Sequence, residues 1–525
     1  MSQTDRSMAL AHSPAELNAQ QKMGSALGMA GLIILLLAVF NVNFPNKTLW
    51  LSLSLGSIVA GITWFSYASY AHETAGIKND GVWFKSMTSR GILAWLAGLG
   101  FTAFYIVLYF YPAFLGLNKD AGNAGIIALF DPLSNFLNGS PADQWFVYGT
   151  LYTVAILGFG IKFLWKYRHS SYQIVRTCSV MFFQLAFAFL IPEILKSLNK
   201  PAYAANTIWP LNYDLFAGYK LDSFFAAGNL GIAMLIFSVL SIFVITPILT
   251  YKYGKRWYCS WVCGCGGLAE TAGDPYRHLS DTSDKAWKIE RWVIHSVLVF
   301  VTVMTIALVY SYLGDNADKF WLTQGVFLYS SAGFLTLLFG LIMIFKRKEL
   351  AKDAKFGAIG YLVVILSIIG IHFFSGNQNV FLFPAHKLRE TYGFLIGAVF
   401  SGVVGVGFYP IFGNRVWCRF GCPMAAVLGM QQRLFSKFRI TTNGGQCISC
   451  GNCSAYCEMG IDVREYAQKG MNIVRSSCVG CGICSEVCPR GVLKLENDSP
   501  HGRINPKEVL LGNDVNLMDY VNQKN

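Results

Sequence analysis

The chain alternates between long apolar runs and short charged segments from residue 24 to residue 413. A helix needs roughly 20 apolar residues to cross a bilayer core of about 30 Å. The runs of this kind lie at 24–43, 48–70, 91–112, 145–165, 174–195, 227–250, 292–313, 330–345, 357–375 and 393–413. This pattern predicts a mainly α-helical, polytopic membrane bundle of about ten spans.

Both ends of the chain are polar. Residues 1–23 predict an N-terminal tail, and the first apolar run is too long for the h-region of a cleaved signal peptide. The segment 251–291 is expected to be a large loop between spans. After the transmembrane domain at 24–413 we expect a linker at 414–440, a compact module at 441–498 and a C-terminal tail at 499–525.

Composition and charge agree with a membrane protein. Apolar residues make up 54% of the chain and charged residues only 14%, which excludes an ordinary soluble multidomain protein. The net charge of +13 comes from basic residues that flank apolar runs. We therefore expect the lipid bilayer as a partner and no nucleic acid. Alternate connections carry 21 and 8 Lys and Arg residues. The positive-inside rule then places both termini in the cytoplasm of a bacterial inner membrane.

Eight cysteines of the C-terminal module form two similar runs, Cys447-x2-Cys450-x2-Cys453-x3-Cys457 and Cys478-x2-Cys481-x2-Cys484-x3-Cys488-Pro489. Runs of this spacing hold [4Fe–4S] clusters, and in two-cluster ferredoxins the fourth cysteine of each run ligates the other cluster. The sequence thus predicts a two-cluster, ferredoxin-like α+β module. Cluster A is assigned to Cys447, Cys450, Cys453 and Cys488, and cluster B to Cys478, Cys481, Cys484 and Cys457. Reduced cytoplasmic thiols and zinc-site spacing disfavour disulfides and structural zinc.

Two further cysteine pairs follow apolar runs. Cys259 and Cys263 come after the sixth run and Cys418 and Cys422 after the tenth, each pair spaced i, i+4 so that both sulfurs share one helical face. They are either cysteines packed as small hydrophobes or two half-sites of one redox or metal centre at the cytoplasmic membrane edge, binding an additional Fe–S cluster, iron or copper. Cys265 is a further thiol beside the first pair.

Two polar residues of the fifth apolar run are further candidates. Gln184 and Glu193 could belong to a proton path, although Lys196 is close enough in sequence to pair with Glu193.

These motifs resemble the membrane-bound polyferredoxins of the NosR, NapH and CcoG type, over about residues 227–495. Such proteins share two C-x3-C-P elements beside membrane helices, followed by two ferredoxin motifs. Here Gly264 stands in place of the first proline, and Glu458 follows Cys457 where the second ferredoxin run has proline. The flavin domain of NosR-like members has no counterpart of sufficient length, so no covalent flavin is expected on this chain.

The motifs and the resemblance together predict an integral-membrane electron-transfer protein, a subunit of an oxidoreductase system. Electrons would move between a cytoplasmic donor or the quinone pool and a membrane or extracytoplasmic redox partner, such as a flavoprotein or a periplasmic acceptor. A redox-gated permease and a copper reductase remain as alternatives.

Overall fold

The computed structural model describes residues 17–71, 88–118, 120, 122–348, 350, 352–375, 384–443 and 446–497. Most of the expected N-terminal tail and all of the tail at 499–525 lie outside the described residues.

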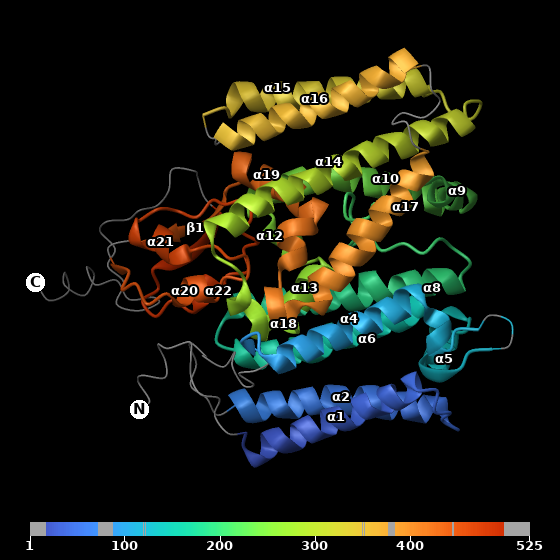
Figure 1. The fold of residues 1–525 in the computed structure, drawn as a ribbon, viewed down its shortest axis with the longest axis vertical. Helices are drawn as coiled ribbons and strands as arrows, with labels where there is room; N and C mark the ends of the chain where they lie inside the picture. The colour runs from blue at the N-terminus through green and yellow to red at the C-terminus, as the bar shows by residue number, and fades with distance from the viewer. Residues whose placement is uncertain are drawn as a thin grey trace, which may run out of the picture.

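A bundle of long helices makes up most of the described chain (Figure 1). Within the described ranges, ten helices are long and apolar enough to cross a membrane. They are α1 (Ala19–Val39), α2 (Lys47–Tyr70), α4 (Ile92–Phe110), α6 (Gln144–Lys166), Ser171–Ser197, Asn229–Tyr253, α14 (Asp284–Asp315), α15 (Gln324–Phe345), α16 (Lys352–Ser375) and Ala385–Gly407. The predicted set of ten long apolar helices is confirmed, and the short eighth run proves to be part of the 22-residue helix α15.

Three of these spans contain π-helical stretches. The span Ser171–Ser197 consists of α7 (Ser171–Phe182), a π segment (Phe183–Leu190) and α8 (Ile191–Ser197). The other two comprise α10 (Asn229–Leu240), π segment Ser241–Ile245 and α11 (Thr246–Tyr253), and α17 (Ala385–Tyr392) with π segment Gly393–Gly407. Since π-helical bulges are frequent at functional sites, these three spans are candidates to line a functional site.

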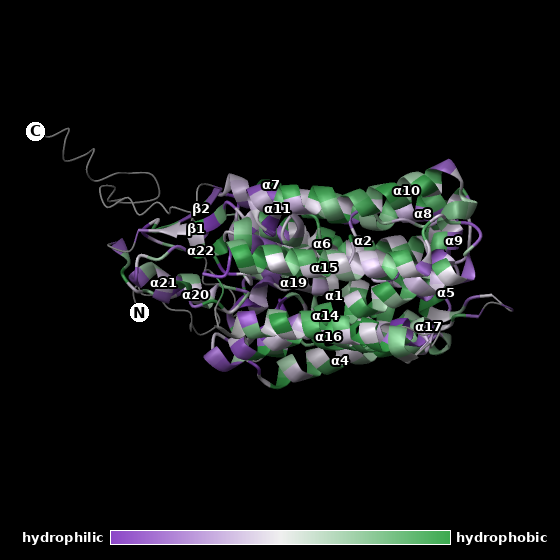
Figure 2. Ribbon diagram, turned by 90° about the horizontal axis from the view of Figure 1, so that it is seen from above, coloured by the Kyte–Doolittle hydropathy of each residue, from purple (hydrophilic) through white to green (hydrophobic). Residues whose placement is uncertain are grey.

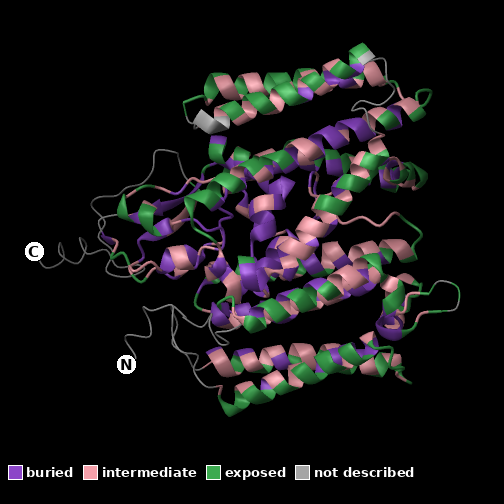
Figure 3. Ribbon diagram, viewed as in Figure 1, coloured by how far each residue is buried: buried purple, intermediate pink, exposed green. Residues whose placement is uncertain are grey.

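Two helix pairs flank the bundle. The pair α1/α2 and the pair α15/α16 lie at opposite edges (Figure 1), and buried residues gather between them (Figure 3). In α1 and α2 the backbones touch, because a Cβ at Gly61 would lie 2.4 Å from the Gly28 nitrogen. Small residues allow such close packing in membranes.

Short elements close the end of the bundle opposite the cysteine-rich module. They are the 3₁₀ turn Pro112–Leu115, α5 (Gly125–Asn138) and α9 (Gly218–Ala226). Here Glu193 accepts hydrogen bonds from Lys196 at 2.7 Å and from Asn138 at 2.6 Å. The pairing of Glu193 with Lys196 is thus confirmed.

Two segments expected outside the spans turn back into the bundle. The first contains α12 (Arg256–Cys259), α13 (Gly264–Thr271) and the 3₁₀ turn Asp274–Leu279. The second follows α18 (Tyr409–Phe412), at the end of the tenth expected run, and contains π turn Trp417–Gly421 and α19 (Pro423–Phe435). A Cβ at Gly264 would lie 2.4 Å from Oε1 of Gln184, the middle residue of its span, and one at Gly421 would lie 2.6 Å from Phe400. The expected loop 251–291 and linker 414–440 are therefore partly re-entrant.

The C-terminal module lies at one end of the bundle and is more hydrophilic than the spans (Figure 2). Strands β1 (Phe438–Thr442) and β2 (Leu493–Asn497) pair antiparallel, with Ile440 opposite Leu495. Helices α20 (Asn452–Ala455), α21 (Val463–Gln468) and α22 (Ile483–Glu486) complete the described module. Because the number of spans is even, α1 begins at the module's end of the bundle.

Candidate iron–sulfur centres

The two cysteine runs of the module share one backbone conformation. Gly451 and Gly482, at the same place in each run, have φ of 80° and 81°, in the left-handed region that favours glycine. At the end of each run an amide lies 3.4 Å from a cysteine sulfur, Ile461 N from Cys457 and Val492 N from Cys488. The chain therefore builds two equivalent loops whose thiols point inward.

The structure brings the four cysteines assigned to cluster A around one hollow. Its lining includes Cys447, Cys450, Cys453 and Cys488 together with Pro489. Burial, and to a smaller extent the neighbouring Cys488 and Cys450, raise the pKa of the Cys453 thiol to about 12. A cationic cluster core would offset this mutual repulsion, so the donor set fits a cluster bound by thiolates.

The cysteines assigned to cluster B also lie together. Cys484 interacts electrostatically with Cys481, Cys478 and Cys457. Burial raises the pKa of Cys457 to about 11, against the effect of the Ile461 amide. The positions of the thiols are thus compatible with the prediction that the fourth cysteine of each run ligates the cluster of the other run.

The two re-entrant segments are built alike. In each, the amide of the second cysteine donates to the carbonyl of the residue before the first, Cys263 to Tyr258 at 2.8 Å and Cys422 to Trp417 at 2.9 Å. The second cysteine then caps a helix that runs back toward the module, with φ, ψ of −72°, 123° at Cys263 and −82°, 113° at Cys422. The predicted likeness of the two pairs extends to their backbone.

The thiols of both segments meet inside the bundle. Each of Cys259, Cys263, Cys418 and Cys422 is buried and interacts electrostatically with the other three. Cys265 joins this group, which we call the interior centre, and also faces Tyr148, only one turn from the far end of α6. The re-entrant turns carry these thiols into the helical bundle, and the expected position at the cytoplasmic membrane edge stays a prediction.

The surroundings of the interior centre fit an anionic cluster. Trp417 Nε1 and Arg415 Nε are buried donors without a hydrogen-bond partner in the described structure, and the N-terminus of α19 begins directly after Cys422. Among the described residues, no group of three or more His, Cys, Asp or Glu side chains is spaced to hold one metal ion.

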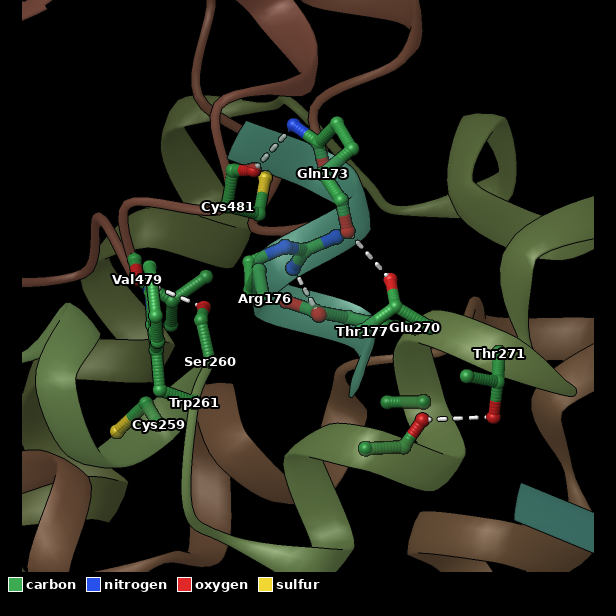
Figure 4. A network of polar contacts seen from close by, with 12 residues as sticks. Gln173, Arg176, Thr177, Cys259, Ser260, Trp261, Glu270, Thr271, Val479 and Cys481 are labelled. Carbon is green, nitrogen blue, oxygen red and sulfur yellow. Dashed lines mark hydrogen bonds and ion pairs between the residues drawn. The ribbon is translucent and has the colours of Figure 1, made fainter. Parts of the chain in front are cut away.

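Four carbonyls of the cluster B loop receive hydrogen bonds from the membrane domain. Figure 4 shows Gln173 Nε2 donating to Cys481 O and Ser260 Oγ to Val479 O, both at 2.9 Å. The other two donors are Tyr172 OH to Gly480 O at 2.9 Å and Gln432 Nε2 to Cys478 O at 2.8 Å. The loop assigned to cluster B therefore faces the membrane domain.

A buried ionic network lies between the module and the bundle. Arg176 and Arg415 both pair with Glu270, while Arg415 and Arg277 pair with Glu458 at 3.0 and 2.6 Å. It continues to Asp274, which pairs with Arg277 at 2.8 Å and with Lys166 at 2.7 Å. These four cations exceed the three carboxylates by one, which suits neighbouring anionic clusters.

Sequence reasoning missed most of this network. Only Glu458 carried a signal, since it replaces the proline of the other run. The arginines lie in segments where, in the sequence, basic residues indicate only the orientation of the spans.

A family described as "4Fe-4S dicluster domain" matches residues 446–493. A second, described as "4Fe-4S binding domain", matches twice, at residues 235–282 and 394–441. Cys259 and Cys418 each lie 24 residues after the first residue of their match. The two re-entrant segments are therefore internal repeats of one sequence pattern.

The chain is also similar to YccM of Escherichia coli (strain K12), which carries the name of an electron transport protein. The two are 29% identical over 108 residues, or 21% of this chain and 30% of the relative. The chain thus matches less than a third of that protein's length. No solved structure matches. Together these findings identify an iron–sulfur electron-transfer protein with ferredoxin-type domains and candidate membrane spans, and they do not place the chain in the NosR, NapH and CcoG type.

Proposed function

We propose that this protein carries electrons between the two faces of a bacterial cytoplasmic membrane, with clusters A and B and a third cluster at the interior centre. The observation that carries the proposal is the depth of the interior thiols within the helical bundle, where they are buried and where Gly264, between Cys263 and Cys265, packs against Gln184. A redox centre at that depth divides the crossing into two shorter steps. Iron–sulfur clusters, when bound, supply one-electron chemistry.

The three sites follow one another from the outer part of the module to the interior of the bundle. The hollow of cluster A is on the outer part of the module, with Ile448 and Ser449 exposed, and it suits contact with a cytoplasmic redox protein. The loop of cluster B docks on the membrane domain. Ser260 then joins that loop to Cys259 through one residue and one hydrogen bond. Electrons thus have a short covalent and hydrogen-bonded connection from the module to the interior.

Aromatic rings continue from the interior centre toward the opposite face. Tyr152 and Tyr148 both interact electrostatically with Cys265. The ring centroids are 5.6 Å apart for Tyr152 and Tyr148, 6.2 Å for Tyr148 and Tyr105, 5.6 Å for Tyr105 and Tyr109, and 4.9 Å for Tyr109 and Trp145. This row supports an acceptor at the opposite face, either a redox partner protein or quinone.

The opposite face also reaches the interior centre through the chain between α8 and α9. Tyr258, next to Cys259, donates to the carbonyl of Asn206 at 2.9 Å. Irregular backbone is tolerated at membrane depth only where protein buries it or where it lines a cavity. The contact brings a segment of the opposite face beside the thiols.

The alternatives have less support. A permease would need charged residues along a path, and the buried charges described above are paired with one another at the module's end. A copper reductase would hold its metal at the same interior thiols, and the match of both re-entrant segments to a family described as "4Fe-4S binding domain" favours a cluster there.

Proteoliposomes test the proposal. Reductant is added at the module's side and ferricyanide, which does not cross lipid, is enclosed inside. The Cys422→Ser variant should abolish ferricyanide reduction while both module clusters keep their EPR signals. Cys178→Ser, which changes an exposed cysteine of α7, is the control and should behave as wild type. Normal ferricyanide reduction by Cys422→Ser would refute the proposal.

A further inference from the structure

Glu458 occupies a position where the other cysteine run has Pro489. The two runs have the same backbone conformation in this region, since Gly460 and Gly491, two residues further on, have φ of 62° and 60°. The loop therefore does not need a carboxylate to fold. Yet Glu458 is 1% exposed, so its charge is buried at the boundary between the module and the membrane domain.

Two arginines and one amide hold this carboxylate. Arg277 donates to Oε2 at 2.6 Å, Asn414 donates to Oε2 at 3.3 Å, and Arg415 pairs with Oε1 at 3.0 Å. Both arginines are themselves buried, and a buried carboxylate with two cationic partners is favoured in its charged form. The side chain thus carries a full negative charge.

Arg415 connects this charge with the interior centre. Its Nη1 lies 3.5 Å from Cys418 Sγ and donates to the carbonyl of Cys259 at 3.2 Å. On the other side, Arg277 interacts electrostatically with Cys481 of the cluster B loop. Glu458 and its two arginines therefore lie between two groups of thiols.

Glu458 itself acts on thiols of both groups. It interacts electrostatically with Cys457, Cys478 and Cys481 of the module and with Cys418 of the interior centre. Charges act over longer distances in a buried region than in water, because the surrounding protein screens them weakly. One carboxylate can therefore influence two centres.

We propose that Glu458 is a positioning residue that links cluster B electrostatically to the interior centre and sets the reduction potentials of both. This proposal rests on the proposed function, since it assumes clusters at both sites. Net charge near a cluster is one of the features that determine its potential. A fixed negative charge disfavours the reduced, more negative state, so Glu458 holds both potentials below the value they would otherwise have.

The test is a redox titration of the full-length protein, followed by EPR. Glu458→Gln keeps the size of the side chain and removes its charge, so the potentials of cluster B and the interior centre should both rise while cluster A changes little. Arg415→Gln removes a cation and should lower both potentials. In the double variant both potentials should lie between those of the two single variants. The control is Glu465→Gln, an exposed module carboxylate paired with Lys469, which should leave all three potentials unchanged.

Opposite shifts in the two single variants, at unchanged iron content, would distinguish an electrostatic role from a structural one. The proposal is overturned if Glu458→Gln moves only one potential or none, if both variants shift in the same direction, or if every variant loses iron. The wild-type titration tests the proposed function separately. Absence of an interior signal there would refute the third cluster, whereas three signals with unmoved potentials would refute only the link.

Discussion

Ser260 donates a hydrogen bond to the carbonyl of Val479 at 2.9 Å, and this contact joins the interior centre to the module. Ser260 directly follows Cys259, and Val479 directly follows Cys478. The two thiol groups are thus separated by one hydrogen bond and a few covalent bonds.

Ser260→Ala should slow electron transfer from the module to the interior centre, because it removes that contact. Ser179→Ala is a matched control, since Ser179 donates to the carbonyl of Trp261, also at 2.9 Å, but does not touch the module. Each variant should lose about 1 kcal/mol of stability, the net value of one hydrogen bond. Stopped-flow reduction would show the difference, and equal rates in the two variants would argue against the contact as a route.

Cys450→Ala should remove the EPR signal of cluster A and leave that of cluster B. Cys481→Ala should do the reverse, because the two thiols belong to different groups in the structure. Since each cubane binds four irons, the wild type should contain about twelve irons with the interior cluster and about eight without it. Loss of both module signals in each variant would show that the clusters do not form independently.

Gly266→Ala should abolish the interior centre, because a Cβ at this position would lie 2.0 Å from the backbone carbonyl oxygen of Cys259. Gly264→Ala should be tolerated better, since its Cβ would meet the end of the Gln184 side chain, which can move at a cost of about 1 kcal/mol. Iron content and thermal unfolding of the two variants check this order. A stable, fully loaded Gly266→Ala would contradict the close packing at the first cysteine pair.

Tags at Lys348 and Asn443 should be accessible from the cytoplasm and a tag at Asn138 only from outside. The reason is the excess of Lys and Arg on one set of connections, 21 against 8. Protease treatment of inverted vesicles, whose cytoplasmic face points outward, measures this. A tag at Asn443 that is protected from protease in these vesicles would show that the orientation is the opposite of the predicted one.

The sequence by itself determined the ten spans and the two cysteine runs. Both are local patterns: a span needs only length and apolar composition, and a cluster loop needs thiols at short, fixed spacing. The likeness of the pairs Cys259/Cys263 and Cys418/Cys422 was also visible, because the two elements repeat the same residues.

The positions of those pairs in the bundle and the contacts of Glu458 emerge only when the chain is folded. Segments 256–279 and 414–435 contain arginines and other polar residues, so hydropathy places them outside the spans. In the fold, Arg176, Arg277 and Arg415 are paired with Glu270 and Glu458, and most of these partners are distant in sequence. Burying a charge is unfavourable unless a partner is buried with it. Because those partners come together only when the chain folds, no local pattern could reveal that the thiols lie inside the bundle.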